Sequence, residues 1–333
     1  MDPLVSVIII AYNFEWCIKD AIASVLAQTY PRTEVIVVDD ASNDRTADAV
    51  VSFGSRVKLI RNSRRTSNAG LNRNTGIQAA SGEYIAFLDG DDLWEPEKLV
   101  VQMTAAAQYP AAGLVAVDGI QFRHEDGAML KPSLYHTIPW RSSAELQVLN
   151  LYDRLLHGCC IETPSQILVR RAVLDAVGGF TGDLHPRPGG GRGEDYDLLL
   201  KIAARFNFTL SRRSLVRYRY HSSALSALGQ QNDLYFAITD LGILQRQLAW
   251  ANVGYRERIE TLLRHKFRYS CRQAAARGRA GRRLWASRYL MRLLHSHVTP
   301  ANAVYASISL ARVWYPNVLS RAVGNVRRLW RTP

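Results

Sequence analysis

Short apolar runs alternate with segments of helical spacing over the first 120 residues, and no other feature constrains the fold as much. Predicted strands cover residues 5–11, 34–38, 57–60, 84–88 and 114–122. Predicted helices cover residues 18–27, 46–53, 71–80 and 96–109. Because the strands are apolar throughout, this alternation predicts an α/β fold, with a mostly parallel, Rossmann-like sheet sandwiched by helices.

The rest of the chain divides at about residue 226. Residues 124–226 are less regular, with strands expected at 166–169 and 215–221 and helices at 171–177 and 194–204. After residue 226 the pattern is helical, with predicted helices at 234–250, 255–276, 282–297 and 301–314. We therefore expect a catalytic or binding domain over 1–226 and a helical C-terminal extension over 227–333.

The net charge of +13 is concentrated in this extension. Residues 241–333 hold 18 Lys and Arg but only two acids, whereas the first 240 residues hold 24 basic and 27 acidic residues. This asymmetry predicts an anionic partner for the extension and not for the body. An anionic membrane surface is one such partner, and packing onto the body or a solvated helical face are the alternatives. No nucleic acid is expected, because no nucleic-acid-binding motif is present.

Other sequence features favour a cytoplasmic location. No run approaches the roughly 18 apolar residues of a membrane-spanning helix, and the first ten residues read as a core strand without a signal peptide. The four cysteines, Cys17, Cys159, Cys160 and Cys271, lack the paired spacing of metal ligands. We expect reduced cysteines in the cytoplasm, with peripheral contact at the inner face of the membrane as an option.

Two predicted strands end in carboxylates. Asp39 and Asp40 follow the strand at 34–38, and the sequence Asp-Gly-Asp-Asp at 89–92 follows the strand at 84–88. Adjacent carboxylates repel one another and are costly to desolvate, a cost that a divalent cation such as Mg²⁺ or Mn²⁺ removes. In such sheets ligands bind beyond the carboxyl ends of the strands, so both clusters are candidates for one site. The alternative is a pair of acidic turns that cap the following helices.

Four segments in this order resemble the inverting family 2 glycosyltransferases, which have the GT-A nucleotide-sugar-binding fold. The resemblance covers residues 4–226. It lies in VSVIIIAYN (5–13) with SVLAQTY (24–30), EVIVVDDASND (34–44), NAGLNRNTG (68–76) followed by GEY (82–84) and LDGDD (88–92), and GEDYD (193–197).

The resemblance implies a site for the nucleotide of a donor sugar. Its predicted contacts are Ala11, Tyr12, Asn13, Asp39, Asp40, Asn68, Arg73, Asp89 and Gly90. Arg73 is available to a phosphate or to an acid of the cluster. The alternatives are an ordinary strand–helix turn after the first strand, an Asx-type cap at Asp39 and Asp40, and a polar helix start at Asn68.

The resemblance also implies chemistry. Asp89 and Asp91 of the DXD motif, with His221, would hold Mn²⁺ or Mg²⁺, and Asp195 would act as general base toward the acceptor hydroxyl. Acceptor or sugar contacts are expected from Asp92, Trp94, Glu162, Thr163 and Glu194. For Trp94 the alternative is the core, for His221 packing, and for the acids at 194–197 a favourable helix N-terminus.

The predicted function is transfer of a sugar from a nucleotide-diphospho donor, with UDP favoured, to a hydroxyl of a glycan or lipid-linked glycan in polysaccharide biosynthesis. This is a metal-dependent, inverting hexosyltransferase-type reaction. One alternative is a sugar-nucleotide nucleotidyltransferase, which usually has an early Gly-rich and basic loop that residues 11–16 lack. The other is a non-catalytic protein that binds sugar nucleotides or membranes.

Overall fold

The computed structural model describes residues 2–135, 138, 140, 143–182, 193–222, 233–248 and 253–279, and the single residues 287, 290, 291, 306, 307, 309, 310 and 313. The chain divides into two compact units, residues 1–230 and 231–333. The domain boundary predicted at 226/227 lies close to this division, on residues outside those described.

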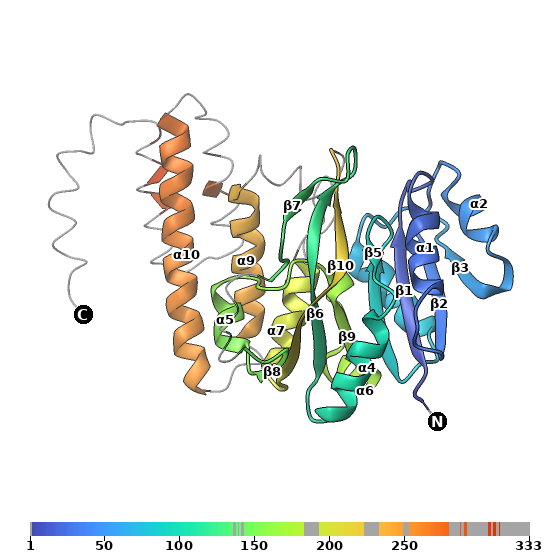
Figure 1. Ribbon diagram of the computed structural model, residues 1–333. Helices are drawn as coiled ribbons and strands as arrows, with labels where there is room; N and C mark the ends of the chain where they lie inside the picture. The colour runs from blue at the N-terminus through green and yellow to red at the C-terminus, as the bar shows by residue number, and fades with distance from the viewer. Residues whose placement is uncertain are drawn as a thin grey trace, which may run out of the picture. The chain divides into compact units, whose positions relative to one another are not determined.

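Ten strands within the described residues of the first unit form a single sheet (Figure 1). They are β1 (Val5–Ala11), β2 (Thr33–Asp39), β3 (Val57–Arg61), β4 (Tyr84–Asp89), β5 (Leu93–Trp94), β6 (Leu114–Arg123), β7 (Met129–Lys131), β8 (Leu146–Leu149), β9 (Ile167–Arg170) and β10 (Phe208–Tyr220). The order is β3-β2-β1-β4-β9-β6-β10-β5, with β7 paired to β6 and β8 paired to β10.

The α/β architecture is confirmed: the long strands pair in parallel, and short antiparallel strands make the sheet mixed. Strands β3, β2, β1 and β4 are parallel to their neighbours, as are β6 and β10. Strand β9 lies antiparallel between β4 and β6, and β5, β7 and β8 also pair antiparallel. Strands β5, β7 and β8 are two to four residues long, too short for an apolar period to predict them, whereas β9 matches the strand expected at 166–169.

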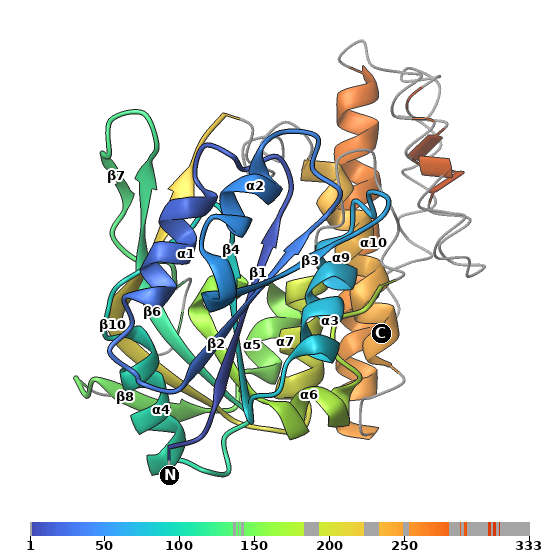
Figure 2. The ribbon, with the colours of Figure 1, turned by 90° about the vertical axis from the view of Figure 1, so that its right-hand side faces the viewer.

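Helices cover both faces of the sheet (Figure 2). They are α1 (Ile18–Leu26), α2 (Thr46–Val51), α3 (Ala69–Ala79), α4 (Lys98–Gln108), α5 (Tyr152–His157), α6 (Arg171–Val177) and α7 (Glu194–Ala203), with 3₁₀ turns η1 (Gly54–Arg56) and η2 (Pro164–Gln166). Helices α1, α2 and α4 share one apolar core with the sheet, and α3 packs on the opposite face. Helices α5 and α6 pack against α7.

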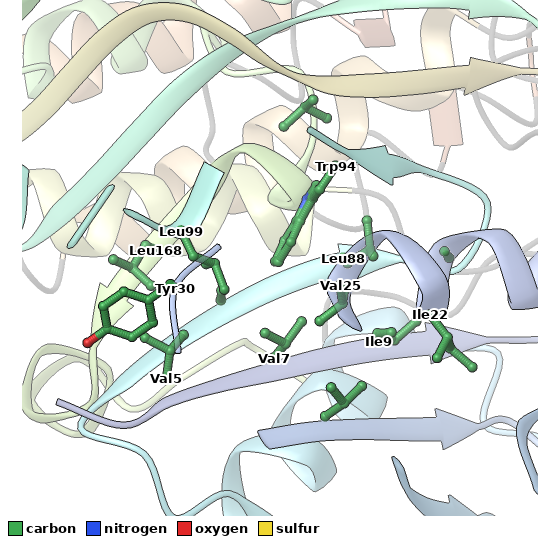
Figure 3. Close-up of a cluster of buried hydrophobic side chains, with 14 of the residues drawn as sticks. Val5, Val7, Ile9, Ile22, Val25, Tyr30, Leu88, Trp94, Leu99 and Leu168 are labelled. Atoms are coloured by element: carbon green, nitrogen blue, oxygen red, sulfur yellow. The ribbon is translucent and has the colours of Figure 1, made fainter. Parts of the chain in front are cut away.

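Alternation along β1 assigns its side chains to these two faces. Val5, Val7 and Ile9 are buried in one core, where Val7 and Ile9 lie near Val25 and Ile22 of α1 and Val5 lies near Tyr30 (Figure 3). Ile8 points the other way, and a Cβ at Gly76 of α3 would lie 2.4 Å from its Cγ2, so only glycine allows α3 this close approach. Full burial of each such side chain stabilises the fold by about 1.5–3 kcal/mol.

Strand register brings the two acidic clusters to one edge of the sheet. Ala11 of β1 pairs with Asp39 of β2, and Ile10 pairs with Asp89 of β4. All three strands run in parallel, so both clusters lie at their carboxyl ends. The register therefore positions a candidate site at this edge.

The second unit is helical where it is described. Helices α9 (Asp233–Gln247) and α10 (Val253–Arg279) confirm two predicted helices, and their core includes Leu241, Phe267 and Cys271. The helices predicted at 282–297 and 301–314 lie mostly outside the described residues. Among the helices that the structure describes, none has the length and apolar character needed to cross a bilayer.

Candidate active site

Asp40, directly after β2, is saturated with hydrogen bonds. Asp40 accepts from the amides of Thr66 and Ser67 at 2.8 and 2.9 Å and from the Asn62 side chain at 2.9 Å. Burial alone would raise the pKa of Asp40, but these hydrogen bonds, led by the Thr66 amide, outweigh burial and lower the pKa. The carboxylate thus holds the loop that leads into α3.

Asp39, the last residue of β2, is fully buried. Its Oδ1 accepts from the amide and hydroxyl of Ser42, and its Oδ2 lies 3.3 Å from Nε of Arg61 without a hydrogen bond. Asp44, just before α2, accepts from the Thr46 amide through Oδ1 at 2.9 Å. Asp39 therefore shapes the β2 turn, and a nucleotide contact from either aspartate stays a prediction.

The turn after β1 is held by backbone hydrogen bonds and carries one aromatic side chain, Tyr12. The carbonyl of Ala11 accepts from the Asp40 amide, and the amide of Asn13 (φ 55°) donates to the Ser42 hydroxyl. Tyr12 is half-buried, and the guanidinium carbon of Arg65 lies 3.6 Å from the centroid of its ring. Tyr12 is thus the predicted residue here whose side chain presents a flat surface at the sheet edge.

Two predicted donor contacts, Asn68 and Gly90, form hydrogen bonds within the protein, and their contact with a nucleotide stays a prediction. Asn68 caps α3, with Oδ1 accepting from the Leu71 amide at 3.0 Å and Nδ2 donating to the Gly182 carbonyl at 2.8 Å. The Gly90 amide donates to the Ile10 carbonyl, and a Cβ at Gly90 would lie 2.8 Å from that oxygen. Glycine at position 90 allows this close approach to β1.

Arg73 joins two acids that are far apart in the sequence. Its Nη2 donates to Oδ1 of Asp89 at 2.6 Å, and its Nη1 donates to Oε1 of Glu194 at 2.9 Å. The Arg73 side chain is 4% exposed, and that of Asp89 is 23% exposed. Of the two roles that the sequence left open for Arg73, the structure shows the contact with acids.

The start of α7 brings the candidate base to this cluster. Gly193, in the left-handed region with φ 97°, turns the chain into the helix, and Glu194 and Asp195 form its first turn. Burial, and next the nearby Asp195, raise the pKa of Glu194 to about 7. Burial also raises the pKa of Asp195, against the opposing charge of Arg73. Glu194 is buried and forms an ion pair with Arg73, and its predicted sugar contact stays a prediction.

Asp91 and His221 meet at the same edge. His221 follows β10, and its Nε2 lies 3.0 Å from Oδ2 of Asp91. Nε of Arg219 donates to the Asp91 carbonyl at 2.8 Å, and the ring of Trp16 stands edge-on to His221 with centroids 5.1 Å apart. The structure thus joins two of the three predicted metal ligands.

The third predicted ligand, Asp89, is held by Arg73 and by the Thr163 hydroxyl at 3.2 Å. No preformed group of three or more acidic, His or Cys side chains suited to a metal occurs within the described ranges. The pair that is present, one carboxylate and one imidazole, suits Mn²⁺ as a donor set if substrate oxygens complete the coordination.

Two predicted sugar contacts are buried and are corrected. Asp92 is fully buried, with Oδ2 accepting from the Ser165 hydroxyl at 2.7 Å and Oδ1 from the Arg219 amide at 3.0 Å. Burial, and next the charge of Asp91, raise its pKa well above the usual range. Trp94 is 4% exposed, donates from Nε1 to the Ser165 carbonyl and lies under Nζ of Lys98. Both residues form hydrogen bonds with Ser165 and so support the site from within the protein.

The segment around η2 lies beside the cluster. Thr163 is buried and caps η2 in a capping box with Gln166, and its hydroxyl contacts Asp89. Glu162 lies farther out and forms a 3.5 Å ion pair with Lys131 of β7. Of these two predicted acceptor residues, the structure brings Thr163 into contact with the acidic cluster.

The sequence reasoning missed three residues of the site: Trp16, Ser165 and Arg219. Ser165 donates to Asp92 and accepts from the Asp89 amide, so it connects both ends of the acidic turn. Arg219 had a usable signal, because alternation along β10 places it on the same side as His221. For Trp16 and Ser165 no sequence signal marked their proximity to residues about 70 to 200 positions away.

Comparison with known proteins places this site in a family. The model described as glycosyl transferase family 2 matches residues 6–178. This chain belongs to glycosyltransferase family 2.

Individual relatives share parts of the chain. It is 27% identical over 242 residues to the uncharacterized glycosyltransferase RP339 of Rickettsia prowazekii (strain Madrid E), covering 70% of this chain and 71% of the relative. It is 47% identical over 104 residues to the Escherichia coli protein named UDP-Glc:alpha-D-GlcNAc-diphosphoundecaprenol beta-1,3-glucosyltransferase WfgD, covering 31% of this chain and 41% of the relative.

Solved structures share the fold. Residues 1–349 of Staphylococcus aureus TarS in complex with UDP-GlcNAc match with a TM-score of 0.66 and 17% identity, covering 93% of this chain and 89% of the other. The same protein in complex with UDP matches with a TM-score of 0.63. The likeness confirms the predicted GT-A-type fold.

Proposed function

We propose that this family 2 glycosyltransferase moves a sugar, with inversion, from a UDP-sugar to an acceptor hydroxyl, with Asp195 as general base. The observation that carries the proposal is the Arg73 bridge, because it joins the acidic strand end at Asp89 to the helix start that bears Asp195. An in-line displacement requires the leaving group and the proton acceptor within one small volume.

Asp195 suits the role of base by its position and its environment. It is half-buried in the first turn of α7, and its raised pKa makes it a stronger proton acceptor than an exposed aspartate. In the proposed reaction its carboxylate takes the proton of the acceptor hydroxyl as that oxygen bonds to the anomeric carbon and the nucleoside diphosphate departs.

Asp91 and His221 would hold a divalent cation, Mn²⁺ or Mg²⁺, as part of the proposal. When bound, such an ion stabilises negative charge on the departing diphosphate as a Lewis acid. Tyr12 is proposed to stack on the uracil ring of the donor, and Thr163 is proposed to line the acceptor side of the site. A matched structure contains UDP-GlcNAc, and a matched relative is named for UDP-Glc transfer to a diphosphoundecaprenol-linked sugar. We therefore favour UDP and a glycan or lipid-linked acceptor.

The proposal is tested with a panel of nucleotide sugars, each with Mn²⁺, Mg²⁺ or chelator, and a mixture of lipid-linked and soluble glycan acceptors. We expect one UDP-sugar to release UDP and raise the melting temperature, and the release to stop in chelator. Absence of release and of thermal shift with every donor would refute the proposed function.

The basic extension is proposed to bind anionic membrane from the cytoplasmic side. Unit 2 carries 18 Lys and Arg and four acids, so its positive charges greatly outnumber its negative ones. Exposed Tyr269 lies among the arginines of α10, a mixture typical of interfacial helices. Vesicles with anionic lipid should retain the full chain and not a chain ending at residue 230. Equal retention of both would contradict membrane binding through the extension.

A further inference from the structure

Helix α3 connects the two acidic ends of the candidate site through one buried cation. Arg73 uses two different nitrogens of its guanidinium, one for Asp89 of β4 and the other for Glu194 of α7. The guanidinium is planar and rigid, so the two carboxylates that it binds are held at a set separation. A lysine, with a single ammonium on a flexible stem, does not impose such a separation.

The surroundings of Arg73 keep it charged and fixed. Burial would lower its pKa, but the charges of Asp89 and then Glu194 outweigh burial and raise the pKa. The guanidinium carbon also lies 5.3 Å from the centroid of the Phe180 ring. Because the side chain is 4% exposed, water competes little for these contacts.

Close packing of α3 supports the same connection independently of charge. A Cβ at Gly70, one turn before Arg73, would lie 3.2 Å from the Cβ atoms of both Glu194 and Phe180. Asn74 holds Phe180 by two hydrogen bonds, donating to its carbonyl at 2.8 Å and accepting from its amide at 3.0 Å. One face of α3 thus fixes both Phe180 and the first residue of α7.

Asp195 follows Glu194 directly, so its place depends on that contact. The next residue, Tyr196, is anchored by a hydrogen bond from its hydroxyl to the Leu155 carbonyl. The first turn of α7 is therefore held by Arg73 on one side and by α5 on the other. Loss of the Arg73 contact frees one side of this turn and leaves two buried carboxylates without their cation.

We propose that Arg73 is a positioning residue, which sets the separation between Asp89 at the end of β4 and the base Asp195 at the start of α7. This inference rests on the proposed function and assigns Arg73 no contact with the substrate. Sugar transfer then depends on the planar guanidinium of Arg73, which binds through two nitrogens, and not only on its charge.

The first experiment compares Arg73→Lys, Arg73→Gln and Arg171→Gln with the unmodified protein. Arg171 is the matched control, because its guanidinium makes three hydrogen bonds to the carbonyls of Gly82, Ile77 and Ala80 and none to an acid of the site. For each folded variant, kcat and KM for the active donor and the Kd for UDP by calorimetry are measured.

Arg73→Lys is expected to keep the Kd for UDP within about threefold and to lower kcat by about tenfold or more, because misplacement of a reacting group acts on the chemical step. Arg73→Gln should lower kcat further than Arg73→Lys does. Arg171→Gln should lower the melting temperature and leave kcat unchanged. A kcat for Arg73→Lys equal to that of the unmodified protein, or an equal kcat loss in Arg171→Gln, would overturn the proposal.

The second experiment is a double-mutant cycle on thermal unfolding with Arg73→Gln, Glu194→Gln and the double variant, which needs no activity. The two melting-temperature losses should be strongly non-additive, and additive losses would overturn the connection through Glu194. If the unmodified protein transfers no sugar, the proposed function fails whatever the cycle shows. If it transfers sugar and Arg73→Lys does so equally well, only the positioning role fails.

Discussion

Two acidic clusters lie at the same edge of one sheet, but their hydrogen-bond partners differ and their pKa values shift in opposite directions. Asp40, after β2, is surrounded by amide and side-chain donors, and its pKa is lowered. At the other cluster Asp89 and Glu194 share one cation, Arg73, and burial raises the pKa of Glu194 and of the neighbouring Asp195. A saturated carboxylate builds a rigid loop, whereas an incompletely compensated one is available to take up a proton or bind a cation.

The largest expected effect is on turnover at the incompletely compensated cluster. Asp195→Asn should lower kcat by about 10²–10⁴-fold, because an amide cannot accept the hydroxyl proton, and should leave UDP affinity nearly unchanged. The measurement is steady-state transfer beside calorimetry with UDP. Asp175→Asn, at an exposed position of α6, serves as the control. Unchanged transfer by Asp195→Asn would remove this residue from the mechanism.

At the saturated cluster the expected effect is on stability. Asp40→Asn places an NH₂ group against the Thr66 or Ser67 amide and should cost about 2–3 kcal/mol of unfolding free energy. Because the folded pKa of Asp40 is lowered, its contribution is present above its unfolded pKa and is lost as the pH falls through the folded value. Urea unfolding at pH 7 and near pH 3 measures both effects. Asp48→Asn, at an exposed position of α2, should stay within about 0.5 kcal/mol.

A smaller effect is expected from the pair of Asp91 and His221. Asp91→Ala should weaken UDP binding about tenfold in Mn²⁺ and not at all in chelator, because its role is to hold the cation and not the nucleotide. Calorimetry in the two buffers gives the comparison, and Asp126→Ala, in the exposed turn between β6 and β7, is the control. An equal loss in chelator would count against the metal role.

The smallest effect expected is a pH dependence from Glu194. Its folded pKa, about 7, lies above its unfolded value, so its contribution to stability is present below the unfolded pKa and is lost as the pH rises through 7. Relative to Glu194→Gln, the unmodified protein should lose on the order of 5 °C of melting temperature between pH 5 and pH 8. A difference in melting temperature that does not change with pH would show that this carboxyl titrates normally.

The parallel half of the fold was predictable and the antiparallel part was not. Strands β1, β2 and β4 are largely apolar and alternate along the chain with helical segments, which the local period reveals. The antiparallel part includes shorter elements: strands β5, β7 and β8 and helix α5. The pairing of β5 and β8 is set by contacts with β10, which is distant in the sequence. Strand β9 was predicted, but its place between β4 and β6 could not be read from its own sequence.

The site was predictable as a collection of residue types and not as a set of roles. Asp39, Asp40, Asp91 and Asp92 look alike in sequence, as acids that follow apolar strands. Burial and partners separate them: Asp92 and Trp94 support the site from below, and Asp91 meets His221 from 130 residues away. No local pattern encodes which of these side chains is covered by another element.

The sequence by itself determined the α/β alternation, the edge of the sheet where acids gather, and the charge contrast between body and extension, because these depend on neighbours along the chain. Only the tertiary structure decided which carboxylates are satisfied and which share the cation of Arg73. The physical reason is that the pKa and the orientation of a carboxyl group depend on burial and on donors from other elements. Those partners lie from three to more than a hundred residues away.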